Sequence, residues 1–163
     1  MRLPFRTSMR LTPVLVALAL AGCGKGKESP APAASAAAPA GSELTPFQLE
    51  HGIGPVTSPV TLGPLDKAMA EEGEKLFTAK CSACHKMQER YVGPPLGDVT
   101  VRKSAAFIMN QILDPEGMYS KHPEVKKLLG EYMTQMPNLG LTQDQARQIV
   151  EYLRTQAPGT AGK

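Results

Sequence analysis

The hydrophobic positions of this chain fall into three regions with different spacing. Residues 11–21 form a nearly continuous apolar run, whereas residues 24–42 carry almost no large apolar side chain. From about residue 65 to residue 157, apolar residues recur every three or four positions. That spacing places apolar side chains on one face of a helix, and no stretch alternates as a half-buried strand would. The third region therefore predicts an all-α domain.

Four helices are predicted within this domain. They begin, in chain order, at Asp66, Ser104, Pro123 and Thr142. Aspartate, serine and threonine are favoured N-caps, proline is favoured in the first helical turn, and Thr142-x-x-Gln145 has the form of a capping box. The second helix is expected to end at Asp114-Pro115, because the residue before a proline avoids the helical conformation.

The pattern of residues 1–22 predicts a secretory signal. Three arginines and no acidic residue precede the apolar run, which is too short to cross a bilayer comfortably, since that takes about 20 apolar residues. The run ends in L-A-G-C at Cys23, a sequence that resembles a bacterial lipobox, in which the cysteine is lipidated after cleavage. An ordinary signal peptide that happens to precede a cysteine is the alternative. The lipoprotein interpretation predicts a periplasmic protein, anchored through Cys23 to the inner or outer membrane.

Proline and glycine divide the rest of the chain. Residues 23–44 are rich in alanine and proline and predict a flexible tether. Residues 45–64 add apolar side chains and predict an extended strap laid against the domain, with further disordered tether as the alternative. His51, in this strap, is expected at the surface. Residues 65–158 form the domain, and residues 159–163 a disordered tail.

The charge balance argues against nucleic acid as a partner. The chain has 18 basic and 15 acidic residues, and the signal accounts for three of the basic ones. The mature protein therefore has no excess of cations to neutralise phosphates. The domain itself is small for a hydrophobic core and contains no tryptophan. A large bound apolar group would supply what the core lacks, and without it we expect an unfolded or molten chain.

Residues Cys81 to His85 spell C-x-x-C-H, which in an exported protein predicts covalent attachment of a c-type haem. Each of Cys81 and Cys84 would form a thioether with a vinyl group, and His85 would bind the iron. A thioredoxin-like redox pair is the alternative, but no alternation of strands and helices surrounds the motif. With Cys23 lipidated, the three cysteines need no disulfide.

The order of these motifs resembles that of the class I c-type cytochromes with one haem. The shared features are an N-terminal helix, C-x-x-C-H, a G-P-x-L loop, an M-P loop and a terminal amphipathic helix, and they cover about residues 66–156. The resemblance implies a small fold of about four helices around one covalent haem c with its iron. It also implies that the first and last helices cross, with Gly73 and Phe77 meeting Tyr152 and Leu153.

The resemblance further implies a second axial ligand to the iron. It is a methionine about fifty residues after the haem histidine, and Met136, followed by Pro137, fits that place. Met133 is the main rival. Met118 and His122 are weaker candidates, and His122 is expected at a solvent-exposed helix start.

The G-P-x-L loop implies two more site residues. The carbonyl of Pro94 would accept the second ring N–H of His85, which fixes the tautomer and strengthens the ligand. Leu96 would pack against the haem. Tyr91 and Asn138 are candidate hydrogen-bond donors to a haem propionate or to the methionine sulfur.

Two axial ligands leave no open position on the iron, which favours an electron carrier over an enzyme. We therefore expect a monomeric, membrane-tethered carrier that exchanges single electrons with a respiratory reductase, oxidase or quinol-oxidising complex. Two alternatives stay open. One is a five-coordinate haem enzyme or gas sensor, if Met136 does not bind. The other is a subunit of a respiratory complex that uses haem structurally.

Overall fold

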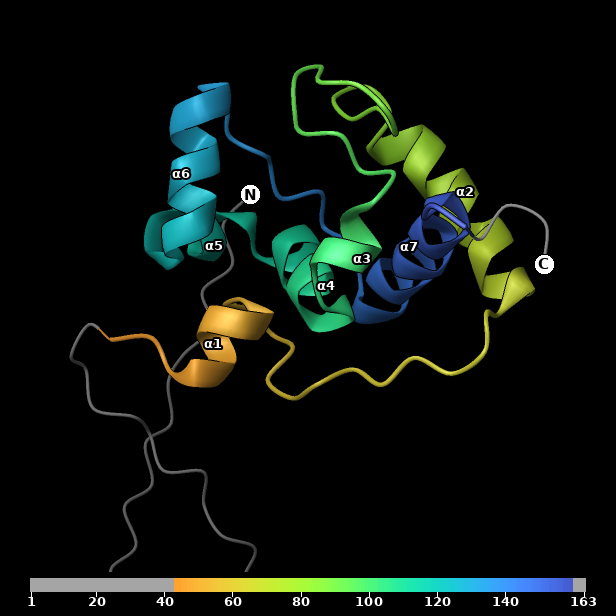
Figure 1. The fold of residues 1–163 in the computed structure, drawn as a ribbon, viewed down its shortest axis with the longest axis horizontal. Coiled ribbons are helices and arrows are strands. Elements are labelled where there is room, and N and C mark those ends of the chain that lie inside the picture. The colour runs from red at the N-terminus through yellow and green to blue at the C-terminus, as the bar shows by residue number, and fades with distance from the viewer. Residues whose placement is uncertain (1–42, 160–163) are drawn as a thin grey trace, which may run out of the picture. The chain divides into compact units, whose positions relative to one another are not determined.

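A computed structural model of the chain describes residues 43–159. Within them lie seven helices and no strand (Figure 1). In chain order they are α1 (Pro46–His51), α2 (Lys67–Lys80), α3 (Val99–Arg102), α4 (Ala105–Leu113), α5 (Pro115–Lys121), α6 (Pro123–Tyr132) and α7 (Gln143–Gln156). No helix among these residues is long and apolar enough to cross a membrane. The predicted signal, the lipidation site Cys23 and most of the predicted tether lie outside the described residues.

The four helices expected from the sequence are α2, α4, α6 and α7. Asp66 and Ser104 accept backbone N–H bonds at the starts of α2 and α4, as their types favour. Pro123 is the first residue of α6. Thr142 and Gln145 form the reciprocal capping box that begins α7. Local sequence signals thus define the main helices of the domain.

Three short helices were not predicted. Thr45 and Gln48 form a capping box for α1, which lies in the segment predicted to be extended. Helix α3 is a single turn between the C-x-x-C-H motif and Ser104, in a segment where no helix was predicted. Pro115, expected only to end α4, also begins α5, and the Asp114 carboxylate accepts the Gly117 N–H at 3.0 Å. A proline that stops one helix can start the next, because its φ suits the first helical position.

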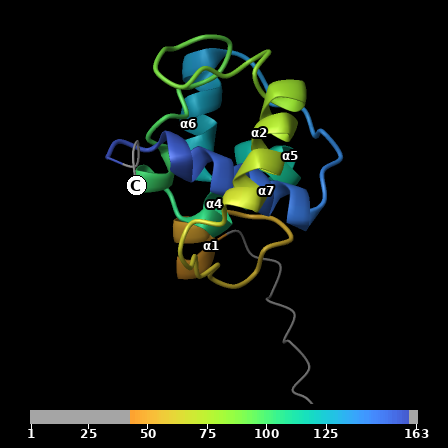
Figure 2. The same cartoon turned by 90° about the vertical axis from the view of Figure 1, so that its right-hand side faces the viewer.

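Helices α2 and α7 cross in close contact, as the resemblance implied (Figure 2). At the crossing, a β-carbon built on Gly73 would lie 2.0 Å from the backbone oxygen of Gln148, so only glycine fits there. Beside it, the rings of Phe77 and Tyr152 pack with their centroids 5.2 Å apart and their planes tilted by 46°. Leu153 is buried in the same core. The missing side chain lets the two backbones meet, and the aromatic pair fills the space around them.

Helix α7 buries one charged residue that the apolar pattern did not predict. Glu151 is fully buried and lies between two arginines, 2.5 Å from Arg147 Nη1 and 2.6 Å from Arg154 Nη1. Arg154 Nη2 also donates to the carbonyl of Gly63 at 2.9 Å. The buried carboxylate is therefore compensated by two cations, and one of them ties the strap to α7.

The strap, residues 45–64, is helical at first and then irregular; its helix α1 lies against α4, and the following Ile53 contacts Met118 of α5. Its main attachment is Asn110, a fully buried residue of α4. The Asn110 amide nitrogen donates to the carbonyls of His51 at 3.0 Å and Val56 at 2.9 Å, and its oxygen accepts the Val56 N–H at 2.9 Å. One buried amide thus satisfies three backbone groups of the strap.

Two histidines expected at the surface are covered by this packing, and both predictions were wrong. The side chain of His51 is only 14% exposed, and its Nδ1 lies 2.8 Å from the Ser104 hydroxyl. His122 is 2% exposed, donates from Nε2 to the Leu49 carbonyl at 3.1 Å, and packs edge-on against Phe107. Helix α1 packs on α4, which brings its last residue, His51, against Ser104 and covers His122 with Leu49.

The crossing of α2 and α7 can be tested at its glycine. Replacing Gly73 by alanine is expected to lower the free energy of unfolding by about 2 kcal/mol, within the usual range for overpacking, because a backbone carbonyl blocks the added methyl group. Gly130, in α6, has no atom within 4 Å of a built β-carbon, so Gly130→Ala is the matched control. It should stabilise the protein by about 0.5–1 kcal/mol. Denaturant titration of the haem-loaded protein compares the two, and equal effects would contradict the close crossing.

Candidate functional site

The C-terminal end of α2 turns the C-x-x-C-H motif toward a pocket. Cys81 is the C-cap of α2, and its carbonyl accepts the N–H groups of Cys84 at 3.0 Å and His85 at 2.9 Å. This tight turn brings the side chains of all three residues to the lining of one pocket. Cys81 is buried and Cys84 is partly buried, and both are free thiols. Burial, and then the neighbouring Cys84, raises the pKa of the Cys81 thiol to about 11, so it is neutral near pH 7.

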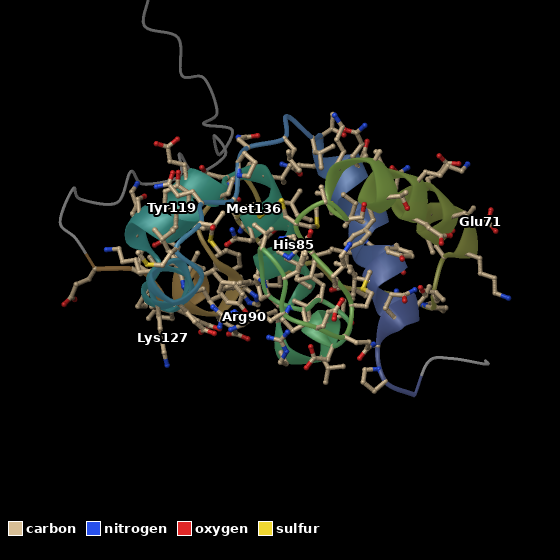
Figure 3. The ribbon with its side chains drawn as sticks, turned by 90° about the horizontal axis from the view of Figure 1, so that it is seen from above. Glu71, His85, Arg90, Tyr119, Lys127 and Met136 are labelled. Carbon is tan, nitrogen blue, oxygen red and sulfur yellow. The ribbon has the colours of Figure 1, made fainter. Side chains whose placement is uncertain are left out.

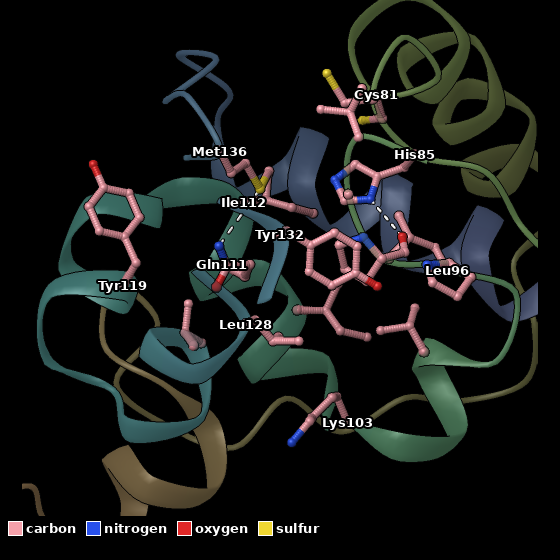
Figure 4. A pocket seen from close by; sticks show the side chains of 18 of the residues that line it. Cys81, His85, Leu96, Lys103, Gln111, Ile112, Tyr119, Leu128, Tyr132 and Met136 are labelled. Carbon is pink, nitrogen blue, oxygen red and sulfur yellow. Dashed lines mark hydrogen bonds between the residues drawn. The ribbon is translucent and has the colours of Figure 1, made fainter. Parts of the chain in front are cut away.

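The imidazole of His85 is held in one orientation by the following loop. Its Nδ1–H donates to the carbonyl of Pro94 at 2.9 Å, as the resemblance implied. Gly93 lies flat against the ring, and a β-carbon built there would be 2.5 Å from His85 Cε1. The Gly93 N–H in turn donates to the carbonyl of Cys84 at 2.8 Å. With Nδ1 engaged, Nε2 is the nitrogen that faces the pocket (Figure 4).

The walls of the pocket are mainly apolar and come from α4, α6, α7 and the loop that follows the motif. Six aliphatic side chains of these walls are Leu96, Ile108, Ile112, Leu128, Leu129 and Leu153. Leu96 is thus in the lining, where it would contact a bound haem. Met136 approaches from the wall opposite His85, so a nitrogen and a thioether sulfur face each other across an apolar space (Figure 4).

The other candidate axial ligands lie elsewhere. Met133 is 83% exposed and adopts φ +53° at the C-cap of α6, outside the pocket lining. Met118 is fully buried under the strap, where its sulfur accepts the Ile53 N–H at 3.0 Å. His122 is turned toward α1. Of the four candidates for the second axial ligand, Met136, Met133, Met118 and His122, only Met136 lines the same pocket as His85.

Neither predicted donor to the methionine sulfur reaches it. Tyr91 is exposed and does not line the pocket. Asn138 instead ties its loop to the end of α4, where it donates to the Leu113 carbonyl at 3.2 Å. The donor beside the sulfur is Gln111 of α4, whose Nε2 lies 3.7 Å from Met136 Sδ. In the sequence, Gln111 is one of two adjacent amides in an otherwise apolar helix. Hydrophobic periodicity alone did not mark it as a residue of the pocket.

Helix α6 forms a wall of the pocket but has little contact with the rest of the domain. Among the described helices its backbone lies close only to α5, and its one buried side chain, Val125, belongs to a small apolar cluster with Phe107 of α4 and Met118 of α5. Ion pairs hold both of its ends. Lys103 pairs with Glu124 near the start, and Arg90 pairs with Glu131 at 3.0 Å near the end. Figure 3 shows Lys127, on its outer face, directed away from His85 and Met136. The apolar face of α6 is thus turned toward the pocket.

Comparison with known proteins agrees with this site. Residues 70–157 match the family model for cytochrome c. A cytochrome c-553-like protein of Synechocystis sp. is 31% identical over 72 residues, which cover 41% of this chain and 69% of that protein. Among solved structures, cytochrome c from Rhodothermus marinus is similar, with 47% identity and a TM-score of 0.65 over 69% of this chain and 97% of that one.

An engineered Rhodothermus marinus cytochrome c bound to a carbene intermediate is also similar, with 46% identity and a TM-score of 0.62 over 69% of this chain and 98% of that one. The helical fold and the thiol–thiol–imidazole site define a c-type cytochrome with one haem. The chain belongs to the cytochrome c family, whose members carry covalent haem c with its iron and transfer electrons.

The residues of the pocket fit that group. Haem is a flat, largely apolar macrocycle, and the pocket offers mainly apolar walls with two thiols and an imidazole at one side. A sulfur on the facing wall completes a nitrogen and thioether pair of the kind that binds iron in such proteins. The lining of the pocket comes from segments spread along the domain, from Phe77 in α2 to Leu153 in α7, so the bound group would act as the centre of the core.

The support that Gly93 gives to His85 can be tested by substitution. In Gly93→Ala the new methyl group would overlap the imidazole, and the ring must tilt away from its hydrogen bond with Pro94. We expect a weaker proximal ligand, seen as loss of low-spin character in the ferric optical spectrum. Gly63→Ala is the control, because nothing lies within 4 Å of a β-carbon there. An unchanged Gly93→Ala spectrum would show that the ring is not held by this contact.

Proposed function

We propose that this protein is a lipid-anchored periplasmic electron carrier in which His85 and Met136 bind the haem iron from opposite faces. When bound, the haem supplies one-electron chemistry between its ferrous and ferric states. The observation that carries the proposal is the facing pair: the Nε2 side of His85 and the sulfur of Met136 line opposite walls of one apolar pocket.

Each residue of the site has a distinct task in this proposal. Cys81 and Cys84 attach the group covalently, so it cannot dissociate. The carbonyl of Pro94 keeps the His85 ring in one tautomer and orientation. Met136 covers the other face, which leaves no position for a substrate.

Weak, brief docking is expected of such a carrier. Three cations beside the pocket are already paired with acids: Lys103 with Glu124, Arg90 with Glu131, and Arg102 with Asp98. Of the three cations in the pocket lining, Lys80, Arg102 and Lys103, only Lys80 forms no ion pair among the described residues, so little uncompensated charge is left there to hold a partner tightly. We propose redox proteins as the partners, namely a respiratory reductase, an oxidase or a quinol-oxidising complex, and a monomer as the working state.

The ligand assignment predicts the response to carbon monoxide. The reduced wild-type protein should not bind the gas, because Met136 occupies the sixth position, and the ferric protein should show the weak red charge-transfer band of methionine ligation. Met136→Ala should lose that band and bind carbon monoxide. Optical spectra of both redox states, recorded with and without the gas, measure this.

Met133→Ala is the matched control, since that side chain is 83% exposed and lies outside the pocket lining. It should behave as wild type. If wild type binds carbon monoxide readily, the iron is accessible, and a haem enzyme or gas sensor becomes the better assignment. If Met133→Ala loses the band and Met136→Ala keeps it, the distal ligand has been assigned to the wrong methionine.

The membrane anchor is proposed from the sequence, namely the arginines and the apolar run that precede L-A-G-C at Cys23. Cys23→Ala should remove the lipid and release the haem-loaded protein from the membrane fraction, while the haem spectrum stays unchanged. Fractionation of cells, with haem staining of the membrane and soluble fractions, measures the effect. Retention of the Cys23→Ala protein in the membrane fraction would contradict lipidation at this cysteine.

A further inference from the structure

Met136 lies in a segment that few hydrogen bonds hold in place. Residues 133–142 join α6 to α7 and form no helix. No backbone group of residues 134–141 bonds to another backbone group in the described part of the chain. Two side-chain contacts connect the segment to α4, one through Asn138 and one between Met136 and Gln111. The position of Met136 therefore depends on the two helices between which the segment runs.

These two helices are not equally fixed. Helix α7 lies along α2 through the crossing at Gly73. Helix α6 lies close only to α5 among the described helices, and its buried residue, Val125, belongs to its first turn. In its last turn, Leu129 and Tyr132 line the pocket, so a bound group supports one side of that turn. The other side needs an anchor of its own.

Arg90 supplies this anchor from the loop that follows the C-x-x-C-H motif (Figure 3). Its Nη1 donates to the Glu131 carboxylate at 3.0 Å, and its Nη2 donates to the Glu131 backbone carbonyl at 2.8 Å. The guanidinium also lies over the ring of Tyr132, 4.2 Å from the centroid. One planar cation thus makes three contacts with the last turn of α6, and we call these contacts the latch.

The latch suits the end of a helix. The last carbonyl groups of a helix have no partner within it and carry partial negative charge, so a cation beside them is favourable. The arginine fork binds a carbonyl and a carboxylate at once, and its flat face stacks on an aromatic ring, which the ammonium of a lysine cannot match. An exposed ion pair alone contributes little, because fixing two long side chains opposes it. Here one ordered side chain, that of Arg90, serves three contacts.

We propose that Arg90 is a positioning residue, which holds the last turn of α6 against the loop of His85 and thereby keeps Met136 on the iron. This inference rests on the proposed function, in which Met136 is the distal ligand. The loop that bears Arg90 also presses Gly93 against the His85 ring and offers it the carbonyl of Pro94. The latch therefore joins the supports of both ligands. When it opens, the end of α6 and residues 133–142 are free to move together, and Met136 leaves the iron more often.

The test is the rate at which excess cyanide replaces Met136 in the ferric, haem-loaded full chain. Loss of the red charge-transfer band follows the exchange, and at saturating cyanide the rate reports how often Met136 leaves the iron. Arg90→Gln should raise this rate about fivefold, the factor that corresponds to about 1 kcal/mol. Glu131→Gln breaks the latch from the other side, and the double variant should be no faster than Arg90→Gln, because both changes remove the same contacts.

Lys75→Gln is the matched control. It removes one cation from an exposed ion pair, that of Lys75 with Glu72 at 2.7 Å, on α2 and outside the lining of the pocket. The change in net charge is the same as in Arg90→Gln, but the rate should equal that of wild type. Equal rates in wild type and Arg90→Gln, or an equal acceleration in Lys75→Gln, would overturn the inference.

Salt separates a positioning role from a merely structural one. The side chains of Arg90 and Glu131 are about half exposed, so dissolved ions screen their attraction. The wild-type rate should therefore rise with ionic strength toward that of Arg90→Gln, whose own rate should stay nearly constant. An arginine that only stabilised the whole domain would lower the denaturation midpoint and leave the rate independent of salt. A wild-type rate without salt dependence overturns the inference, and this measurement needs no variant.

The charge-transfer band separates failure of this inference from failure of the proposed function. A ferric wild-type protein that shows the band has methionine on the iron, so unchanged rates in Arg90→Gln would then overturn the role of Arg90 alone. A wild-type protein without the band lacks methionine ligation, and that result overturns both.

Discussion

The contact between the backbones of α2 and α7 is the constraint on which the domain depends. Because Gly73 has no side chain, α2 lies directly on the carbonyl of Gln148, and its direction is fixed by that contact. The attachment motif begins where α2 ends, at Cys81, so the crossing also decides where the thiols and the imidazole lie. A helix displaced by the width of a methyl group would aim the motif elsewhere. The glycine that shapes the fold is therefore also a determinant of the site.

The pocket takes the place of a conventional core. Helix α7, helix α4 and the loop that carries Leu96 each turn apolar side chains toward it, and none of them alone could bury those residues. The family's covalent haem supplies the missing apolar partner for all of them at once. Folding and cofactor attachment are then aspects of one process, as in small domains that rely on a bound metal. This explains how about ninety residues with few aromatics support a defined structure.

Sequence reasoning located the features that depend on a few neighbouring residues. The starts of α2, α4, α6 and α7 follow from caps and prolines, and the placement of Pro94, Leu96 and Met136 around His85 agrees with the motif order. It missed burial that depends on distant contacts. The two arginines that pair with Glu151 lie one turn away on α7 itself, but the burial of this carboxylate depends on how α7 packs in the domain. His122 is covered by α1, whose Leu49 lies 73 residues away in the sequence, so no local pattern reports that contact.

The weak attachment of α6 has a consequence for the life of the protein in the cell. Outside the ion pairs at its two ends, this helix relies on α5 and on whatever fills the pocket. A chain that left the attachment machinery without its cofactor would present α6 and the loop bearing Met136 as loose, apolar and readily cleaved polypeptide. Proteolysis would thus remove unloaded chains and spare loaded ones. The helix that completes the site is thus the helix whose order depends most on the bound group.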